Sequence, residues 1–429
     1  MNRSPTQKAF AAISGADGPA ETLDADAQEH EAANGLRHAV SLSMSKIADG
    51  LIDPKLVLSW LLASLGAPAV YAGALVPLRE AGALLPQMLL AGYVQGMERR
   101  KWAWVLGAAG QGIFAALIVL AALTLEGAAA GLAVCAALTG LALSRALCSV
   151  SYKDILGKTV GQARRGSVTG LAGSASAVGV VVFALLMISG AVEERGAVIA
   201  AIALASLLWG GAALLFTTLN EAPSTAEGST SASFSVLRDN PVLWRFIIVR
   251  GLLVSTALAS PYFVLLGSDG GGGTLGALGA LVLASATASL GSSYIWGRMS
   301  DHSSRRVLML TGMCGAAAMG MALALAQAGL AGTVWAMPGA LFVLMIAYHG
   351  VRQGRSTYLV DVSPEDQRSA YAAVANTVIG VLLLVAGIAG GGAALLGPQA
   401  VLVLFVLMAL AGAAVAHGLP EADSIDHGS

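Results

Sequence analysis

The sequence predicts an all-α integral membrane protein with twelve transmembrane helices in two six-helix halves. Of its 429 residues, 56% are hydrophobic and 11% are charged, whereas a typical soluble domain has about 25% charged residues. Charge-free apolar stretches recur along the chain, each close to the roughly 20 residues that cross the hydrocarbon core of a bilayer. Their order predicts helices over residues 56–78, 80–97, 102–125, 127–151, 167–190 and 196–219 in the first half, and over 241–267, 275–297, 304–327, 333–358, 368–396 and 399–418 in the second.

Polar segments mark the boundaries of the two halves. Residues 1–50 are polar and weakly acidic and lack the apolar stretch of a signal peptide, so we expect a disordered tail with room for a short amphipathic helix near 36–48. A Ser/Thr-rich connection separates the two sets of helices. The predicted organisation is therefore a cytoplasmic tail over 1–50, a first half over 51–219, a cytoplasmic linker over 220–240, a second half over 241–418 and a second tail over 419–429.

Basic residues in the short loops predict the orientation, because cytoplasmic loops carry an excess of Lys and Arg. One set of loops contains only Arg79 and Arg195. We expect both termini and the linker in the cytoplasm, and a multi-pass protein of the cytoplasmic (inner) membrane. The basic loops hold Arg99, Arg100, Lys101, Lys153, Lys158, Arg164, Arg165, Arg238, Arg298, Arg305, Arg306, Arg355 and Arg368.

Composition also argues against several functional classes. A net charge of −1 gives no electrostatic attraction to nucleic acid. The three cysteines lie inside apolar runs, without a CxxC pair or a His/Cys cluster, so we expect neither a metal nor a redox site. The sequence contains no phosphate-binding GxxxxGK[ST] motif. We therefore expect a protein that is not an enzyme, has no cofactor, is monomeric and has membrane lipid around it.

A glycine-led basic turn occurs twice, at residues 92–101 and again at 297–306, a separation of 205 residues. In the second copy Gly297 is followed by Asp301, Arg305 and Arg306. In the first copy the basic pair is Arg100 and Lys101, and Gly96 stands where the second has its aspartate. Two halves that share a turn at one topological position indicate an internal duplication.

This repeated turn, with twelve predicted helices in two sixes, resembles the major facilitator superfamily of transporters. Residues 361–368 are similar to a second acidic-proline-arginine motif of that family, and 158–166 are its weaker echo. The resemblance implies that helices one, four, seven and ten line a central cavity, and that the basic turns form a cytoplasmic gate during rocker-switch alternating access. An alternative is that the arginines only follow the positive-inside bias. The implied gate residues are Gly297, Asp301, Arg305, Arg306, Arg100, Lys101, Asp361 and Arg368.

Three arginines lie deep in predicted spans, where a charge is costly and usually faces a cavity or a partner. They are Arg250 in helix seven, Arg145 in helix four and Arg352 in helix ten. Together they would favour an anionic substrate. The alternative is that their long side chains extend to the cytoplasmic headgroups.

Two titratable residues and four neutral ones complete the candidates. Glu80, expected at the outer mouth beside Arg79, and His349 in helix ten could carry a coupling proton. An ordinary loop ion pair and a hydrogen-bonded core histidine are the alternatives. The neutral candidates for substrate binding, which could equally serve helix packing, are Tyr71, Tyr262, Gln111 and Asn376.

The sequence thus predicts a secondary active transporter of a small solute, with proton coupling and an organic anion as the favoured details. Two alternatives stay open. One is a drug/proton antiporter, although residues 167–190 lack the Gly-Pro pair that such members of the family carry on helix five. The other is a sensor or assembly factor that has the fold and transports nothing.

Overall fold

The computed structural model describes residues 4–14, 23–190, 194–224, 240–267, 275–362 and 368–421, and within them regular structure is helical. The first half contains α1 (Pro5–Ser14), α2 (Ala25–Leu51), α3 (Val57–Ser64), α4 (Ala69–Leu84), α5 (Gln87–Gln95), α6 (Lys101–Thr124), α7 (Gly127–Thr159), α8 (Gln162–Ile188) and α9 (Glu194–Thr217). The second contains α11 (Pro241–Leu253), α12 (Ser255–Leu258), α13 (Ser260–Gly267), α14 (Leu275–His302), α15 (Ser304–Gln327), α16 (Ala336–Val362), α17 (Arg368–Ala394) and α18 (Pro398–His417).

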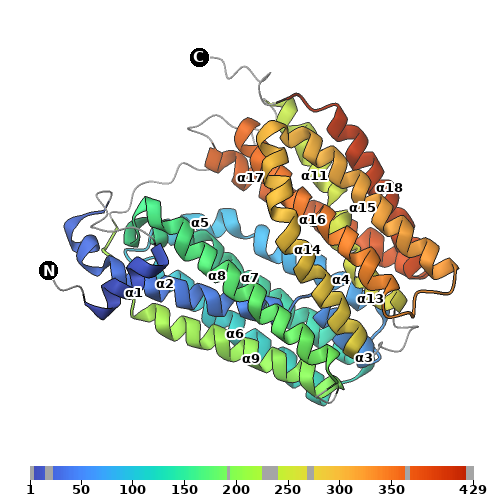
Figure 1. Ribbon diagram of the computed structural model, residues 1–429, viewed down its shortest axis with the longest axis horizontal. Helices are drawn as coiled ribbons and strands as arrows, with labels where there is room; N and C mark the ends of the chain where they lie inside the picture. Colours follow the sequence, from blue (N-terminus) through green and yellow to red (C-terminus); the bar gives the residue numbers. More distant parts are fainter. Residues whose placement is uncertain are drawn as a thin grey trace.

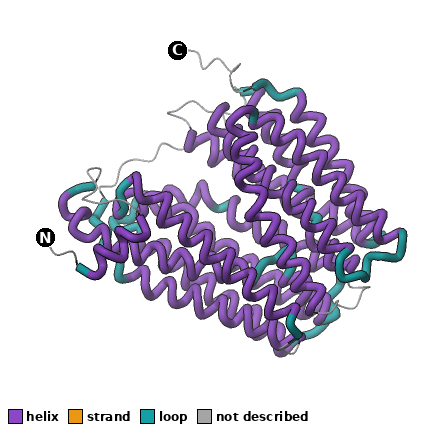
Figure 2. The backbone as a smooth tube through the Cα atoms, viewed as in Figure 1, coloured by secondary structure: helices purple, strands orange, loops and turns teal. Residues whose placement is uncertain are grey.

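These helices form two bundles (Figure 1). In the first, α6 packs between α7 and α9, and α2 packs on α8 and α9; in the second, α15 packs between α16 and α18. The bundles touch where α4 meets α17, where α8 meets α14 and where α3 meets α13. They converge at the end that carries α3 and α13 and diverge toward the end that carries α1, which gives the molecule a V shape (Figure 2).

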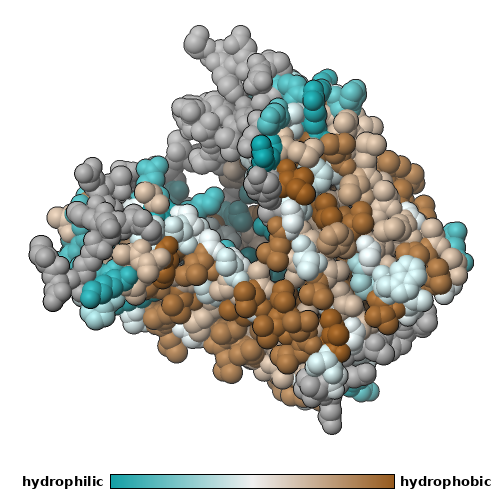
Figure 3. All heavy atoms as spheres, viewed as in Figure 1, coloured by the Kyte–Doolittle hydropathy of each residue, from teal (hydrophilic) through white to brown (hydrophobic). Residues whose placement is uncertain are grey.

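Apolar side chains cover much of the outer surface (Figure 3). Eight helices of the described part are long and apolar enough to cross a membrane. Many of their large hydrophobic residues are exposed, such as Leu207, Leu214 and Ile388, as expected where the solvent is lipid. The eight segments are 101–124, 127–159, 162–188, 195–217, 241–267, 304–327, 371–394 and 398–417. The predicted all-helical membrane fold is therefore confirmed.

The expected disordered tail is wrong for residues 25–50, which lie in α2 inside the first bundle, whereas the short helix expected near 36–48 is part of α2. The polar side chains that argued for a tail have partners from distant segments. Glu31 accepts a hydrogen bond from the backbone N–H of Gly161 at 2.9 Å and pairs with Arg164, and the side chain of Asn34 donates to the carbonyl of Asn220 at 2.8 Å. Because such partners lie more than 100 residues away, polarity along the chain resembled that of a disordered segment.

The expected helix over 56–78 is also wrong, because the chain turns at residues 65–68. Gly66 has a φ of +70°, a conformation that glycine adopts without strain. The N–H groups of Gly66 and Ala67 bond back to the carbonyls of Ala63 and Leu62, which ends α3. As a result Arg79 and Glu80 lie inside α4, and the expected place at a loop between two helices is wrong.

Candidate functional site

A cavity of about 270 Å³ lies between the two bundles, and most of its lining is charged. The first half contributes the end of α2, the break before α3, α4 and α7, and the second half contributes α16. The space-filling view shows the molecule hollowed between its two lobes (Figure 3). The lining residues are Asp49, Asp53, Pro54, Lys55, Arg79, Glu80, Ala83, Arg145, Tyr348, Arg352 and Arg355.

Asp49 bridges two arginines on one wall of this cavity. One carboxylate oxygen accepts a hydrogen bond from Arg79 of α4 at 2.6 Å, and the other pairs with Arg145 of α7. The Arg79 residue is 7% exposed, so its charge depends on this partner. The cluster ties α2, α4 and α7 together at the level of the cavity.

The break between α2 and α3 brings a lysine to the cavity. Asp53 stabilises the break, because its Oδ1 accepts the backbone N–H groups of Lys55 at 2.8 Å and Leu56 at 3.1 Å, as a capping residue does. The Lys55 ammonium then lies 3.7 Å from the ring centre of Tyr348 on α16, a cation–π contact across the two halves.

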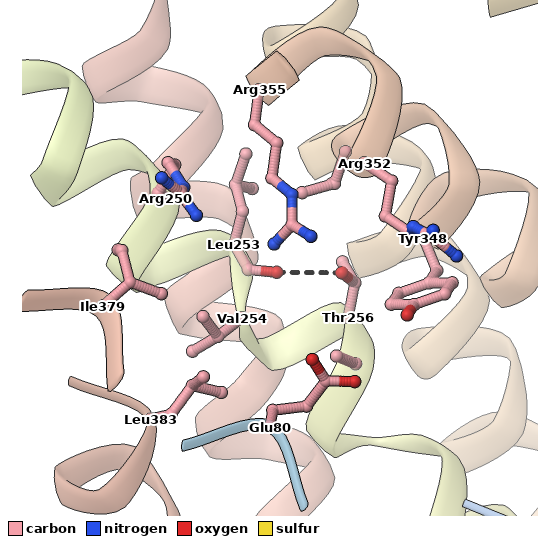
Figure 4. A pocket seen from close by; sticks show the side chains of 12 residues that line it. Glu80, Arg250, Leu253, Val254, Thr256, Tyr348, Arg352, Arg355, Ile379 and Leu383 are labelled. Carbon is pink, nitrogen blue, oxygen red and sulfur yellow. Dashed lines mark hydrogen bonds between the residues drawn. The ribbon is translucent and has the colours of Figure 1, made fainter. Parts of the chain in front are cut away.

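Arg352, Arg355 and Glu80 line the cavity, and the described structure shows no salt bridge among them. Figure 4 shows the Arg355 guanidinium extending between α11 and α16 toward Thr256, with Glu80 below it and Arg352 beside Tyr348. Glu80 and both arginines line two adjoining pockets. Among the described residues none of these three side chains forms an ion pair, in contrast to Arg79 and Arg145. These are the cavity charges that remain available to a ligand.

Arg250, the deepest arginine of the expected set, lines the adjoining pocket with Glu80, Arg352 and Arg355. It is 5% exposed, and its Nη2 donates to the side-chain oxygen of Asn376 on α17 at 3.3 Å. Its guanidinium carbon lies 5.7 Å from the ring centre of Phe246. The three predicted arginines and Glu80 thus come together, and Asn376 joins them through Arg250.

The remaining predicted site residues lie away from the two pocket linings. Tyr71 packs on Gly131, and the buried Tyr262 has its hydroxyl against Gly73 and its ring edge-on to Phe405. Gln111 is buried and donates to Cys148 between α6 and α7. The ring of His349 contacts that of its neighbour Tyr348, with 5.3 Å between ring centres.

The basic turns are held by acidic residues that sequence reasoning missed. In the first half Arg100 pairs with Asp154 of α7 at 2.6 Å, and the backbone N–H groups of Arg100 and Lys101 bond to the carboxylate of Glu221. The ammonium of Lys101 donates to the carbonyls of Thr217 and Leu219.

In the second half Arg305 pairs with Glu421 at 2.7 Å, and Arg306 lies 3.7 Å from the same carboxylate. The hydroxyl of Ser303, which caps α15, donates to Glu421 at 2.7 Å. A glutamate just after the last helix of each half therefore binds the start of α6 in the first half and of α15 in the second. Gly297 lies within α14, and the side chains of Asp301, Asp361 and Arg368 lie outside the described residues.

Asp49, Asp53 and Lys55 are cavity residues that the sequence reasoning did not find. The available signal was their spacing: Lys46, Asp49, Asp53 and Lys55 interrupt an otherwise moderately apolar stretch. Charges so close together lowered the apparent hydropathy and were interpreted as the edge of a tail. Asp49, Asp53 and Lys55 instead line a polar cavity inside the protein.

No protein-family model and no curated protein matches the chain. Several solved structures do match it in fold. The nucleoside transporter NupG aligns with a TM-score of 0.68 at 14% identity over 90% of this chain and 98% of its own. A D-xylose–proton symporter aligns with a TM-score of 0.69 at 12% identity, over 90% and 98% of the two chains. A bacterial homologue of the human lysosomal transporter Spinster, in an inward-facing and occupied conformation, gives a TM-score of 0.56 at 12% identity over 90% and 96%.

Proposed function

From the fold of the major facilitator superfamily transporters, which this chain shares, we propose that it is a secondary transporter of a small organic anion. The observation that carries the proposal is the cavity between the two bundles. Arg145, Arg352 and Arg355 line it, and Arg250 lies in the adjoining pocket. Guanidinium groups match the planar oxygen pairs of carboxylates and phosphates, so an anion is the ligand that this lining suits best.

Transport proceeds by rocker-switch alternating access across the cytoplasmic membrane. In this proposal the chain crosses twelve times, with α2–α3, α4–α5 and α11–α13 each forming one broken crossing. The basic turns at Arg100 and Arg305 mark the cytoplasmic end. Because the bundles diverge toward that end (Figure 1), the cavity faces the cytoplasm in this conformation. The reverse state requires the bundles to separate where α3 meets α13.

Glu80 is the proposed proton carrier. Its carboxylate lies in the cavity among Lys55, Arg352 and Arg355 without an ion pair of its own in the described structure. A proton on Glu80 would leave both arginines free for the anion, whereas a charged Glu80 competes with it. This competition couples the two ligands at one site, and one structural neighbour, the D-xylose–proton symporter, is named as proton-coupled.

Uptake into proteoliposomes tests the transport proposal. Purified full-length protein is expected to move one or more members of a panel of labelled mono- and dicarboxylates and phosphate esters. Arg352→Gln is expected to abolish this uptake, because it removes a cavity charge. Arg195→Gln is the control, since Arg195 bonds to Glu126 and the carbonyl of Ser64 at the opposite end.

The same assay separates the alternatives. Transport of cationic drugs or of D-xylose, with anions ignored, would contradict the anion proposal and favour a drug antiporter or a sugar carrier. Binding of an anion in a thermal-shift assay, with no flux under any gradient, would favour a sensor or assembly factor.

A further inference from the structure

We infer that the transported anion is a compact organic dianion, one end of which is held by Arg352 and Arg355; this inference rests on the proposed transport function. The charges that line the cavity do not cancel. Five lining residues are basic and three are acidic, which leaves an excess of two positive charges while Glu80 is ionised and of three when Glu80 carries the coupling proton. The basic ones are Lys55, Arg79, Arg145, Arg352 and Arg355, and the acidic ones are Asp49, Asp53 and Glu80.

The excess positive charge of the cavity lining is localised on α16. Asp49 pairs with Arg79 and Arg145 on the opposite wall and so balances part of their charge. Lys55 lies against the ring of Tyr348. Arg352 and Arg355 have no carboxylate partner within the described part of the chain.

Their positions suit one ligand group. Residues three apart on a helix lie on the same face, so Arg352 and Arg355 present two guanidinium groups from neighbouring turns. Figure 4 shows the Arg355 side chain extending toward Thr256 and the Arg352 side chain lying beside Tyr348, and both residues line the same cavity. Guanidinium groups bind a carboxylate or a phosphate through paired hydrogen bonds. A dicarboxylate and a phosphate monoester share this chemistry and both supply two negative charges.

The charge of the lining disfavours other classes of ligand. The cavity volume of about 270 Å³ is near the lower end of the roughly 300–1,000 Å³ of small-molecule sites, which suits a small ligand. A neutral sugar or nucleoside would leave both arginines without a counter-charge, and a cation would add to the excess. A monoanion would neutralise at most half of the excess positive charge.

A charge series measured by thermal shift tests this inference. Full-length protein in detergent is titrated at constant ionic strength with succinate, glycerol 3-phosphate, lactate and D-xylose, at about pH 7.5, where a phosphate monoester is mainly doubly charged. Succinate or glycerol 3-phosphate should bind about tenfold more tightly than lactate. D-Xylose should produce no shift.

Substitutions of the two arginines test whether they bind the dianion. Arg355→Gln should weaken binding of the dianion about tenfold, and Arg355→Lys should restore only part of it because the paired hydrogen bonds are lost. Arg195→Gln should bind like the wild type. Each variant's unfolding temperature without ligand is compared with that of the wild type, and Arg352→Gln replaces any variant that does not fold.

The outcomes separate this inference from the transport proposal. If lactate binds as tightly as both dianions, or if Arg355→Gln and Arg352→Gln bind the dianion like the wild type, the dianion inference is overturned while anion transport stands. If no anion of any charge binds or is transported, the proposed function fails and the inference fails with it.

Discussion

At the scale of single residues, Asp49 shows how this protein accommodates charges between its helices. Its two oxygens pair with Arg79 and Arg145, whose side chains are 9% and 37% exposed. A buried guanidinium that loses its partner is costly, because the remaining charge stays away from water. The Arg145 side chain reaches solvent in the cavity, so Arg79 is the one at risk.

Asp49→Asn is therefore expected to lower the free energy of unfolding by about 3 kcal/mol. Asp154→Asn is the matched control, because Asp154 also pairs with two bases but is one-third exposed; its loss is expected at about 1 kcal/mol or less. Thermal unfolding in detergent measures both. An equal loss of unfolding free energy in the two variants would show that the burial of Arg79 does not determine how much stability the ion pair contributes.

The site could be predicted from single residues only in part. Arg145, Arg250, Arg352 and Glu80 were identified because a charge in an apolar run is conspicuous. Asp49 and Lys55 were not, since their neighbours are polar as well and the helix breaks between α2 and α3. Contacts such as Lys55 with Tyr348 join residues nearly 300 positions apart in the sequence, which no local pattern indicates.

At the scale of helices, the two halves use a similar contact, a glutamate at the start of α6 and at the start of α15. Glu221 accepts the first N–H groups of α6, and Glu421 binds the cap and basic pair of α15. A carboxylate at a helix N-terminus interacts favourably with the free N–H groups and the helix dipole. The repeated basic turn was visible in the sequence, but the acids that bind it were not, because they lie in segments assigned to the linker and the tail.

Glu221→Gln is expected to cost about 2 kcal/mol of stability, the upper range for a partly buried charge at a helix end. Glu421→Gln should cost less, about 0.3–1 kcal/mol, because the Glu421 side chain is 32% exposed, whereas that of Glu221 is fully buried. Thermal unfolding at low and high salt checks both values. High salt should reduce the loss of stability only in Glu421→Gln. A larger loss in Glu421→Gln than in Glu221→Gln would contradict this interpretation.

At the scale of the whole molecule, the two bundles meet along α4 and α17, where glycines allow close approach. A Cβ at Gly387 would lie 2.4 Å from Cγ of Pro77, whereas one at Gly392 would meet nothing within 4 Å. The fold class and the division into halves could be predicted from hydropathy and the repeat. The V shape and these contacts could not, because they depend on side-chain shapes across two distant segments.

Gly387→Ala is therefore expected to lower the free energy of unfolding by about 1–3 kcal/mol, the usual cost of overpacking. Gly392→Ala should be neutral or slightly stabilising, since alanine favours helix. Both are read from thermal unfolding of the purified protein. If the two glycines respond alike, the close contact between α4 and α17 is not what determines stability there.

The central claim is that one cavity binds both an anion and a proton, and gradient-driven accumulation tests it most directly. Proteoliposomes are loaded with buffer, and uptake of the transported anion is measured with and without an acidic exterior. The account predicts that wild-type protein concentrates the anion only under the proton gradient and that Glu80→Gln does not concentrate it, while Arg195→Gln behaves as wild type. Accumulation that ignores the gradient, or persists unchanged in Glu80→Gln, would contradict it.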